Sequence, residues 1–175
     1  ERYAEIFQSI ETLLNAPTGS IALAPSATAA QAAIAAAIEP SNKRNRIIIT
    51  DLDFPSCRYL WNAQVHRGFE LIEIKASEGM QIDAGDVIAQ IDDRVAIVAV
   101  SLVSYLNSAR LDIKPIIKAA HGAGAIVVLD AYQAVGVIPL DLTSLGADVV
   151  VGGTHKWLCG GMGLAFAYVE PALAE

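Results

Sequence analysis

A lysine in a glycine-rich segment is the first residue whose setting suggests chemistry. Lys156 stands between Gly152-Gly153 and the segment Trp157-Leu158-Cys159-Gly160-Gly161. A mostly apolar setting removes water from the amine, and desolvation favours the uncharged form that attacks a carbonyl carbon to give a Schiff base. The alternative is a surface lysine in a glycine-rich turn, which is the commoner case for a lysine taken alone.

Asp130 strengthens the interpretation of Lys156 as a reactive amine. It directly follows the apolar run of residues 125–129, where a carboxylate is costly to bury unless it is paired. A helix cap or a structural ion pair would satisfy it. It would equally pair with the protonated nitrogen of a pyridine ring, which turns that ring into an electron sink. Asp130 and Lys156 fit two strand ends of one sheet, and the pair is more specific than either residue.

Three further residues are candidates for binding a phosphate group. Thr28 lies at the start of an alanine-rich helical segment, where a hydroxyl and exposed main-chain N–H groups suit an anion. A simple helix cap, made by Thr28 or by Ser26, is an equally frequent role for such a residue. Thr154 and His155 directly precede Lys156 and would add donors to the same phosphate.

Two more side chains would contact the ring of such a cofactor. Phe54 would lie over the ring face by stacking, although a phenylalanine in the core is the simpler interpretation. Gln133 would donate a hydrogen bond to a ring oxygen, and its alternative is a solvated side chain on a helix.

The elements that position these residues alternate between strands and helices. Helices are expected at residues 2–15, 29–38, 55–67, 83–90 and 112–121. Strands are expected at residues 21–24, 46–50, 69–74, 95–101, 125–129, 147–151 and 163–169. These strands are continuous apolar runs, as in sheets covered on both faces, so the pattern predicts a parallel, doubly wound α/β fold. Ligands bind beyond the carboxyl ends of such strands, where the candidate residues fall.

Composition and charge exclude several classes of protein. The 175 residues are 54% hydrophobic and 18% charged, which fits one folded domain and excludes a disordered chain. The formal net charge is −7, and the sequence has no basic stripe, so duplex nucleic acid is excluded as a partner.

Apolar runs and cysteines add two expectations about location. The apolar runs are far too short to span a bilayer, so no membrane association is expected. Cys57 and Cys159 stand far apart and form neither a disulfide framework nor a zinc site. Free cysteines in this pattern indicate the reducing cytoplasm, and no metal is expected in the site.

The motifs around Asp130 and Lys156 resemble a known family. Residues 127–136 (VVLDAYQAVG) and 148–157 (DVVVGGTHKW) are similar to the class V aminotransferases. These are fold-type I enzymes that use pyridoxal 5′-phosphate (PLP), and the group includes cysteine desulfurases and kynureninases. Residues 26–30, 53–56 and 101–112 match as well, so the resemblance covers nearly all the chain.

The resemblance implies an architecture as well as a cofactor. Residues 1–175 would form the PLP-binding large domain of an aspartate aminotransferase-like transferase, with a mostly parallel sheet that has one antiparallel strand. The smaller C-terminal domain of the family, which commonly supplies the arginine for the substrate carboxylate, is expected to be absent from this chain. The family also implies a homodimer with the active site near the subunit interface.

Each residue that matches a family motif acquires an expected role. Lys156 would form the Schiff base with PLP and then transfer protons, and Asp130 would pair with the pyridinium nitrogen. Gln133 would contact the phenolic oxygen of the ring, and Phe54 would stack on the ring. The phosphate would be held through main chain or side chain by Ala27, Thr28, Thr154 and His155.

The expected activity is class V aminotransfer on a small-molecule amino acid substrate. A PLP-dependent lyase of the kynureninase or cysteine desulfurase type is the second hypothesis. Cysteine desulfurases usually carry histidine at the position of Phe54, and kynureninases usually carry tyrosine at the position of His155, so these departures favour the aminotransferase. A non-catalytic large-domain fragment and a nucleotide-binding α/β domain are the hypotheses from other classes.

Overall fold

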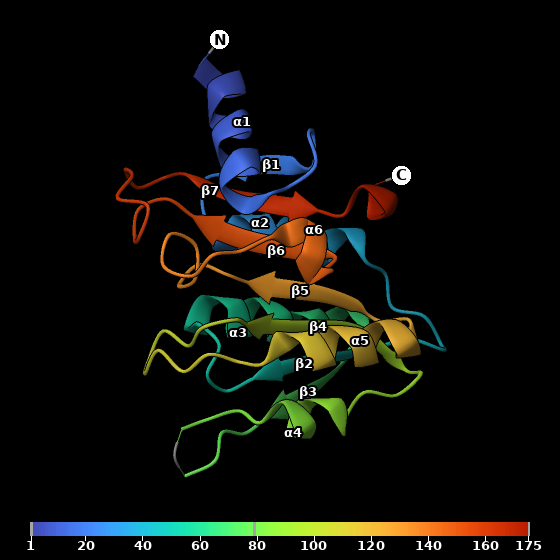
Figure 1. Ribbon diagram of the computed structural model, residues 1–175. Helices are drawn as coiled ribbons and strands as arrows, with labels where there is room; N and C mark the ends of the chain where they lie inside the picture. The colour runs from blue at the N-terminus through green and yellow to red at the C-terminus, as the bar shows by residue number, and fades with distance from the viewer. Residues whose placement is uncertain (1, 79, 175) are drawn as a thin grey trace.

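A seven-stranded sheet in the order β1-β7-β6-β5-β4-β2-β3 forms the centre of the computed structural model, which describes residues 2–78 and 80–174 (Figure 1). The strands are β1 (Ile21–Ala24), β2 (Arg46–Thr50), β3 (Glu70–Ile74), β4 (Val95–Ser101), β5 (Ile126–Asp130), β6 (Val149–Gly153) and β7 (Ala165–Val169). β7 runs antiparallel to both of its neighbours, and the pairs from β3 through β6 are parallel. The predicted α/β sheet with one antiparallel strand is confirmed.

Helices cover both faces of this sheet, as the doubly wound prediction requires. They are α1 (Arg2–Leu14), α2 (Ala27–Ala37), α3 (Pro55–Ala63), α4 (Ala84–Ile88), α5 (Ile113–Ala123) and α6 (Leu142–Leu145), with short 3₁₀ helices η1 (Gln64–Arg67) and η2 (Pro171–Leu173). In Figure 1, α2 and α3 lie behind the sheet, whereas α4, α5 and α6 lie in front. Over the part of the chain that the structure describes, none of these helices has the length and apolar character to cross a membrane.

Two hydrophobic cores explain why the strands are apolar without alternation. On β5, Val127 and Leu129 pack into the core with α5, whereas Val128 packs into the core with α2 and α3. On β6, Val150 joins the first core, and Val149 and Val151 join the second. Central strands such as these bury both of their faces, so an apolar residue is favoured at nearly every position.

The boundaries of several elements differ from the predicted ones. The helix expected at residues 55–67 divides into α3 and the 3₁₀ turn η1, which ends at Gly68 with a left-handed φ of 101°. β6 continues through Gly153, although the glycine pair was expected to follow the strand. A Cβ atom at Gly152 would lie 2.5 Å from the ring of Phe166, so glycine is needed where the ring of β7 crosses the strand.

Candidate active site

The carboxyl ends of the parallel strands meet at one edge of the sheet and border a cavity of about 220 Å³. Its lining comes from the start of α2 and from the segments that follow β2, β4, β5 and β6. The lining residues are Ser26, Ala27, Thr28, Phe54, Ser56, Cys57, Ser101, Val103, Tyr105, Asp130, Tyr132, Gln133, His155 and Lys156. The structure thus brings together every predicted site residue except Thr154.

The amine of Lys156 lies among aromatic rings at this cavity. The residue is half-buried in the turn after β6. Its Nζ lies 4.9 Å from the ring centroid of Tyr132 and 5.6 Å from that of Phe54. Ring faces attract an ammonium ion and also displace water from it. The amine is therefore held at the cavity, and the alternative of a freely solvated surface lysine does not describe it.

The carboxylate of Asp130 occupies the wall of the same cavity at the end of β5. Its Oδ1 accepts a hydrogen bond from the main-chain N–H of Tyr132 at 2.9 Å, and its Oδ2 accepts one from Gln31 Nε2 at 3.1 Å. Desolvation by burial raises the pKa of Asp130, whereas these hydrogen bonds and the charge of Lys156 oppose that rise. A cationic ligand beside this carboxylate would be stabilised, because its charge would compensate for the hydration that the carboxylate loses on burial.

The start of α2 forms the anion-binding end of the cavity. Ser26 is the N-cap, because its Oγ accepts a hydrogen bond from the N–H of Ala29 at 3.1 Å. Thr28 therefore lies inside the first turn, where its Oγ1 shares a hydrogen bond of 2.8 Å with Ser56 Oγ. First-turn N–H groups have no partner inside a helix, so those of Ala27 and Thr28 are suited to a phosphate.

The two residues before Lys156 have different surroundings. His155 lines the cavity, and its Nδ1 shares a hydrogen bond of 2.5 Å with the hydroxyl of Tyr132. Thr154 lies outside the cavity lining, and its hydroxyl donates to the carbonyls of Gly161 and Leu164 at 3.2 Å. Its N–H also donates to the carbonyl of Leu164. The phosphate contact of Thr154 stays a prediction, and in this structure both of its donors hold the following loop.

Phe54 and Gln133 both face the cavity. Phe54 is 43% exposed, so it is not a core residue, and its ring forms an edge-to-face pair with that of Tyr105 at a centroid distance of 5.1 Å. Gln133 Oε1 accepts a hydrogen bond from Trp157 Nε1 at 3.0 Å. Because an indole nitrogen only donates, this bond directs the amide oxygen of Gln133 to Trp157 and leaves its Nε2 to donate to a ligand.

Sequence reasoning missed Gln31 and Tyr132 as neighbours of these residues. Tyr132 contacts both His155 and Lys156, and Gln31 contacts Asp130. The sequence signal for Gln31 is that it is the single amide in the alanine-rich segment of α2. A polar side chain among so many alanines indicates a specific hydrogen-bond partner.

Asp53 ties together the two strand ends beside the cavity. Its buried carboxylate accepts hydrogen bonds from the N–H of Thr50 at 2.7 Å and from that of Ser101 at 2.6 Å. Burial nevertheless raises the pKa of Asp53 from 3.8 to about 6. The side chain thereby joins the ends of β2 and β4, directly before Phe54 in the sequence, and its carboxylate is desolvated in the folded state.

A pH dependence of stability follows from Asp53. The pKa of Asp53 is higher in the folded state than in the unfolded chain. Its contribution to the free energy of unfolding is therefore greatest below about pH 4 and is lost as the pH rises through about 6. The loss amounts to at most about 3 kcal/mol. Asp53→Asn does not titrate, so its free energy of unfolding should lack this part of the pH dependence. Denaturant unfolding at pH 4, 5, 6 and 7 measures it, and parallel curves for both proteins would contradict the assignment.

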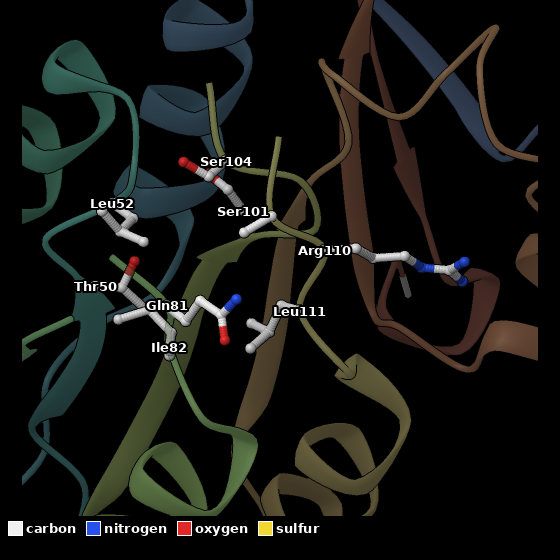
Figure 2. Close-up of a pocket in the computed structure, with 9 residues that line it drawn as sticks. Thr50, Leu52, Gln81, Ile82, Ser101, Ser104, Arg110 and Leu111 are labelled. Atoms are coloured by element: carbon white, nitrogen blue, oxygen red, sulfur yellow. The ribbon is translucent and has the colours of Figure 1, made fainter. Parts of the chain in front are cut away.

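A second cavity of about 170 Å³ shares Ser101 with the first. Figure 2 shows its lining, which includes Thr50, Gln81, Ser104 and Arg110. Arg110 carries the charge of this lining, and in Figure 2 its guanidinium points away from the other labelled side chains. The pairing of an amine with a carboxylate at the strand ends therefore distinguishes the first cavity from this one, and the first cavity is the candidate active site.

The family model described as Aminotransferase class-V matches residues 1–175, so the chain belongs to the class V aminotransferase family. The uncharacterized aminotransferase YcbU of Bacillus subtilis (strain 168) is 31% identical over 163 residues, which are 93% of this chain and 43% of that protein. A kynureninase of Geobacillus thermodenitrificans (strain NG80-2) is 31% identical over 138 residues, which are 75% of this chain and 32% of that enzyme. The chain spans less than half the length of these curated relatives.

Solved structures share the fold of the chain. The cysteine desulfurase CsdA from Escherichia coli aligns with a TM-score of 0.89 at 23% identity, over 98% of this chain and 44% of CsdA. A structure of C-DES with glycine covalently linked to its PLP cofactor aligns with a TM-score of 0.87 at 18% identity, over 98% of this chain and 46% of C-DES. At these identities the likeness shows the fold, and it agrees with the fold class expected from the sequence.

Proposed function

We propose that residues 1–175 form the cofactor-binding large domain of an enzyme that uses PLP to act on an amino acid, with aminotransfer as its reaction. The observation that carries the proposal is that Lys156 and Asp130 line one cavity. Membership of the class V family supports PLP as the cofactor and an amino acid as the substrate. The PLP-linked structure of C-DES, which has the same fold, adds support.

The donor set of the cavity fits the chemical groups of PLP. We propose that the first-turn N–H groups of Ala27 and Thr28 bind the phosphate, together with His155. The ring would be held by Phe54 on its face, by Asp130 at its nitrogen and by the free Nε2 of Gln133 at its phenolic oxygen. Anion-binding and cation-binding groups thus border the same cavity, as a ligand with a phosphate and a basic ring requires.

The proposed chemistry divides between cofactor and protein. PLP, when bound, supplies an electron sink for negative charge next to the substrate amine. Lys156 would hold the cofactor through its Nζ, and as general base and general acid it would take a proton from the substrate Cα and deliver it again. The Asp130 carboxylate would hold a proton on the ring nitrogen. Tyr132 and Phe54 exclude water around the Lys156 amine.

A lyase is the second candidate function, because a kynureninase has the same 31% identity to the chain as YcbU, although over 138 residues instead of 163. Assays of the two reactions separate these candidates. Aminotransfer converts an added keto acid into an amino acid, whereas a lyase releases a fragment of its substrate without any acceptor. A non-catalytic protein would do neither.

Borohydride reduction tests the proposal directly. The protein incubated with PLP should develop a visible absorbance band, and reduction should fix PLP to the peptide that contains Lys156. Mass spectrometry of the digested protein reads the added mass and its position. If PLP produced no band and no adduct, while NAD or ATP raised the melting temperature, the nucleotide-binding hypothesis would replace this one.

A homodimer and a cytoplasmic location complete the proposal. Large apolar side chains lie exposed in the segments that follow β4 and β6, including Leu106 (52%), Trp157 (55%) and Met162 (88%). Exposed apolar side chains after the same strands that lead into the cavity favour contact with a second copy near the active site. Sedimentation should therefore give twice the monomer mass, and a monomer with full PLP occupancy would contradict it. The free thiols of Cys57 and Cys159 are compatible with a reducing cytoplasm.

A further inference from the structure

The geometry points to Gln31 as a positioning residue that keeps the Asp130 carboxylate charged and oriented, with Trp61 fixing the direction of the Gln31 amide. This inference rests on the proposed function, because its consequence concerns the nitrogen of the PLP ring. It extends the site from the cavity wall into the core between α2 and α3 and the sheet.

Three elements bring the network together. Gln31 lies on α2, Trp61 on α3 and Asp130 at the end of β5. Gln31 and Trp61 are each only 2% exposed, so solvent does not satisfy their polar atoms. Trp61 Nε1 donates to Gln31 Oε1 at 2.9 Å, and Gln31 Nε2 donates to Asp130 Oδ2 at 3.1 Å. The chain of hydrogen bonds therefore runs from the indole through the amide to the carboxylate.

The direction of the Gln31 amide is fixed by the chemistry of its partners. An indole N–H donates and never accepts, so the amide oxygen must face Trp61. The amide nitrogen then faces Asp130, where its hydrogens meet an acceptor. A reversed amide would place two donors against each other at Trp61 and two oxygens against each other at Asp130. Both ends of Gln31 thus select the same orientation.

Cys57 adds a second donor to the same carboxylate oxygen. Gln31 Nε2 donates to Cys57 Sγ at 3.2 Å, and Cys57 Sγ donates to Asp130 Oδ2 at 3.5 Å. Burial, and then the charge of Asp130, raise the pKa of Cys57 to about 12. The thiol therefore keeps its hydrogen at neutral pH and remains a donor.

These donors oppose the effect of burial on Asp130. Burial favours the protonated acid, whereas hydrogen bonds from Gln31, Cys57 and the N–H of Tyr132 favour the carboxylate. A carboxylate that stays charged leaves the shared proton on the ring nitrogen of the cofactor. Without Gln31 the carboxylate is the stronger base, and the proton moves toward Asp130. The electron sink then weakens although every residue that touches the cofactor is unchanged.

The test uses PLP labelled with ¹⁵N at the ring nitrogen and bound to the protein. Gln31→Met keeps a long, unbranched side chain but removes the donor to Asp130. The ¹⁵N chemical shift reports how the proton is shared, without a turnover measurement. Hydrogen bonds to charged groups are strong enough to shift the ratio of protonated to unprotonated ring about tenfold or more. Gln8→Met, at an exposed position on α1, is the matched control and should leave the shift unchanged.

The outcomes separate this inference from the proposed function. A ¹⁵N shift in Gln31→Met that moves toward the unprotonated ring supports the role of Gln31, and an unchanged shift with PLP bound overturns it. A wild-type protein that binds no PLP overturns the proposed function instead. If Gln31→Met does not fold, Trp61→Phe decides the matter, because loss of the indole N–H should move the shift in the same direction by a smaller amount. An unmoved shift in that variant overturns the inference as well.

Discussion

Lys156→Ala is expected to abolish the covalent capture of PLP and to lower turnover of an amino acid substrate by a factor on the order of 10²–10⁴. The variant removes the amine that binds the cofactor and that moves the proton at the substrate Cα. The fold should survive, because Lys156 is half-buried in a turn and belongs to neither hydrophobic core. Borohydride reduction followed by mass spectrometry should find no adduct on the peptide that spans residue 156.

Two companion variants make the Lys156 result specific. Lys118→Ala removes an exposed lysine from α5, away from the cavity lining, and should retain both the adduct and the activity. Lys156→Arg keeps a positive charge near Tyr132 and Phe54 but cannot form the Schiff base, so it should behave as Lys156→Ala does. A reducible adduct that persists in Lys156→Ala would show that another amine holds the cofactor.

The central strands of the fold were predictable because burial on both faces gives a continuous run of apolar residues in the sequence. Residues 46–50 and 95–101 were expected as strands and are strands with those bounds, since each is a continuous run rich in β-branched or small apolar residues. α6 was not expected, because a helix of four residues held by the Asp141 side chain at Ser144 N is too short for periodicity. The glycines of β6 were misplaced because the need for them arises from rings that are distant in the sequence, Phe166 at Gly152 and Tyr132 at Gly153.

The site was predictable where it follows from strand ends and not where it depends on packing between helices. Asp130 and Lys156 follow apolar strands, so topology alone brings them to one edge. Thr154 follows the same strand, yet its hydroxyl turns to the loop carbonyls of Gly161 and Leu164. Gln31 meets Trp61 and Asp130 only because α2 and α3 pack together on the same face of the sheet. Such contacts between distant segments produce no recognisable spacing of residues in the sequence.

Asp130→Asn is expected to lower turnover by a factor on the order of 10²–10³, because the neutral amide no longer stabilises a proton on the ring nitrogen. The variant is close in shape to the original, and its Oδ1 still accepts the N–H of Tyr132. PLP should still bind covalently through Lys156, so the adduct after borohydride reduction should remain. Loss of activity with retention of the adduct is therefore the signature of this residue, and it differs from that of Lys156→Ala.

Stability separates this functional role from a structural one. Asp130→Asn removes the cost of burying a charge but places its Nδ2 against the donor Nε2 of Gln31. Because these two effects oppose each other, the free energy of unfolding of the cofactor-free protein should change by no more than about 1 kcal/mol. Asp148→Asn is the opposite case: Asp148 accepts hydrogen bonds from Val127 N and His121 Nε2 beside the start of β6, so its loss should cost about 1–2 kcal/mol without affecting PLP. Denaturant unfolding and a turnover assay on both variants measure the contrast. If Asp130→Asn instead unfolded the protein and retained its specific activity, Asp130 would be a structural carboxylate, and the cavity would have no partner for a cationic ring.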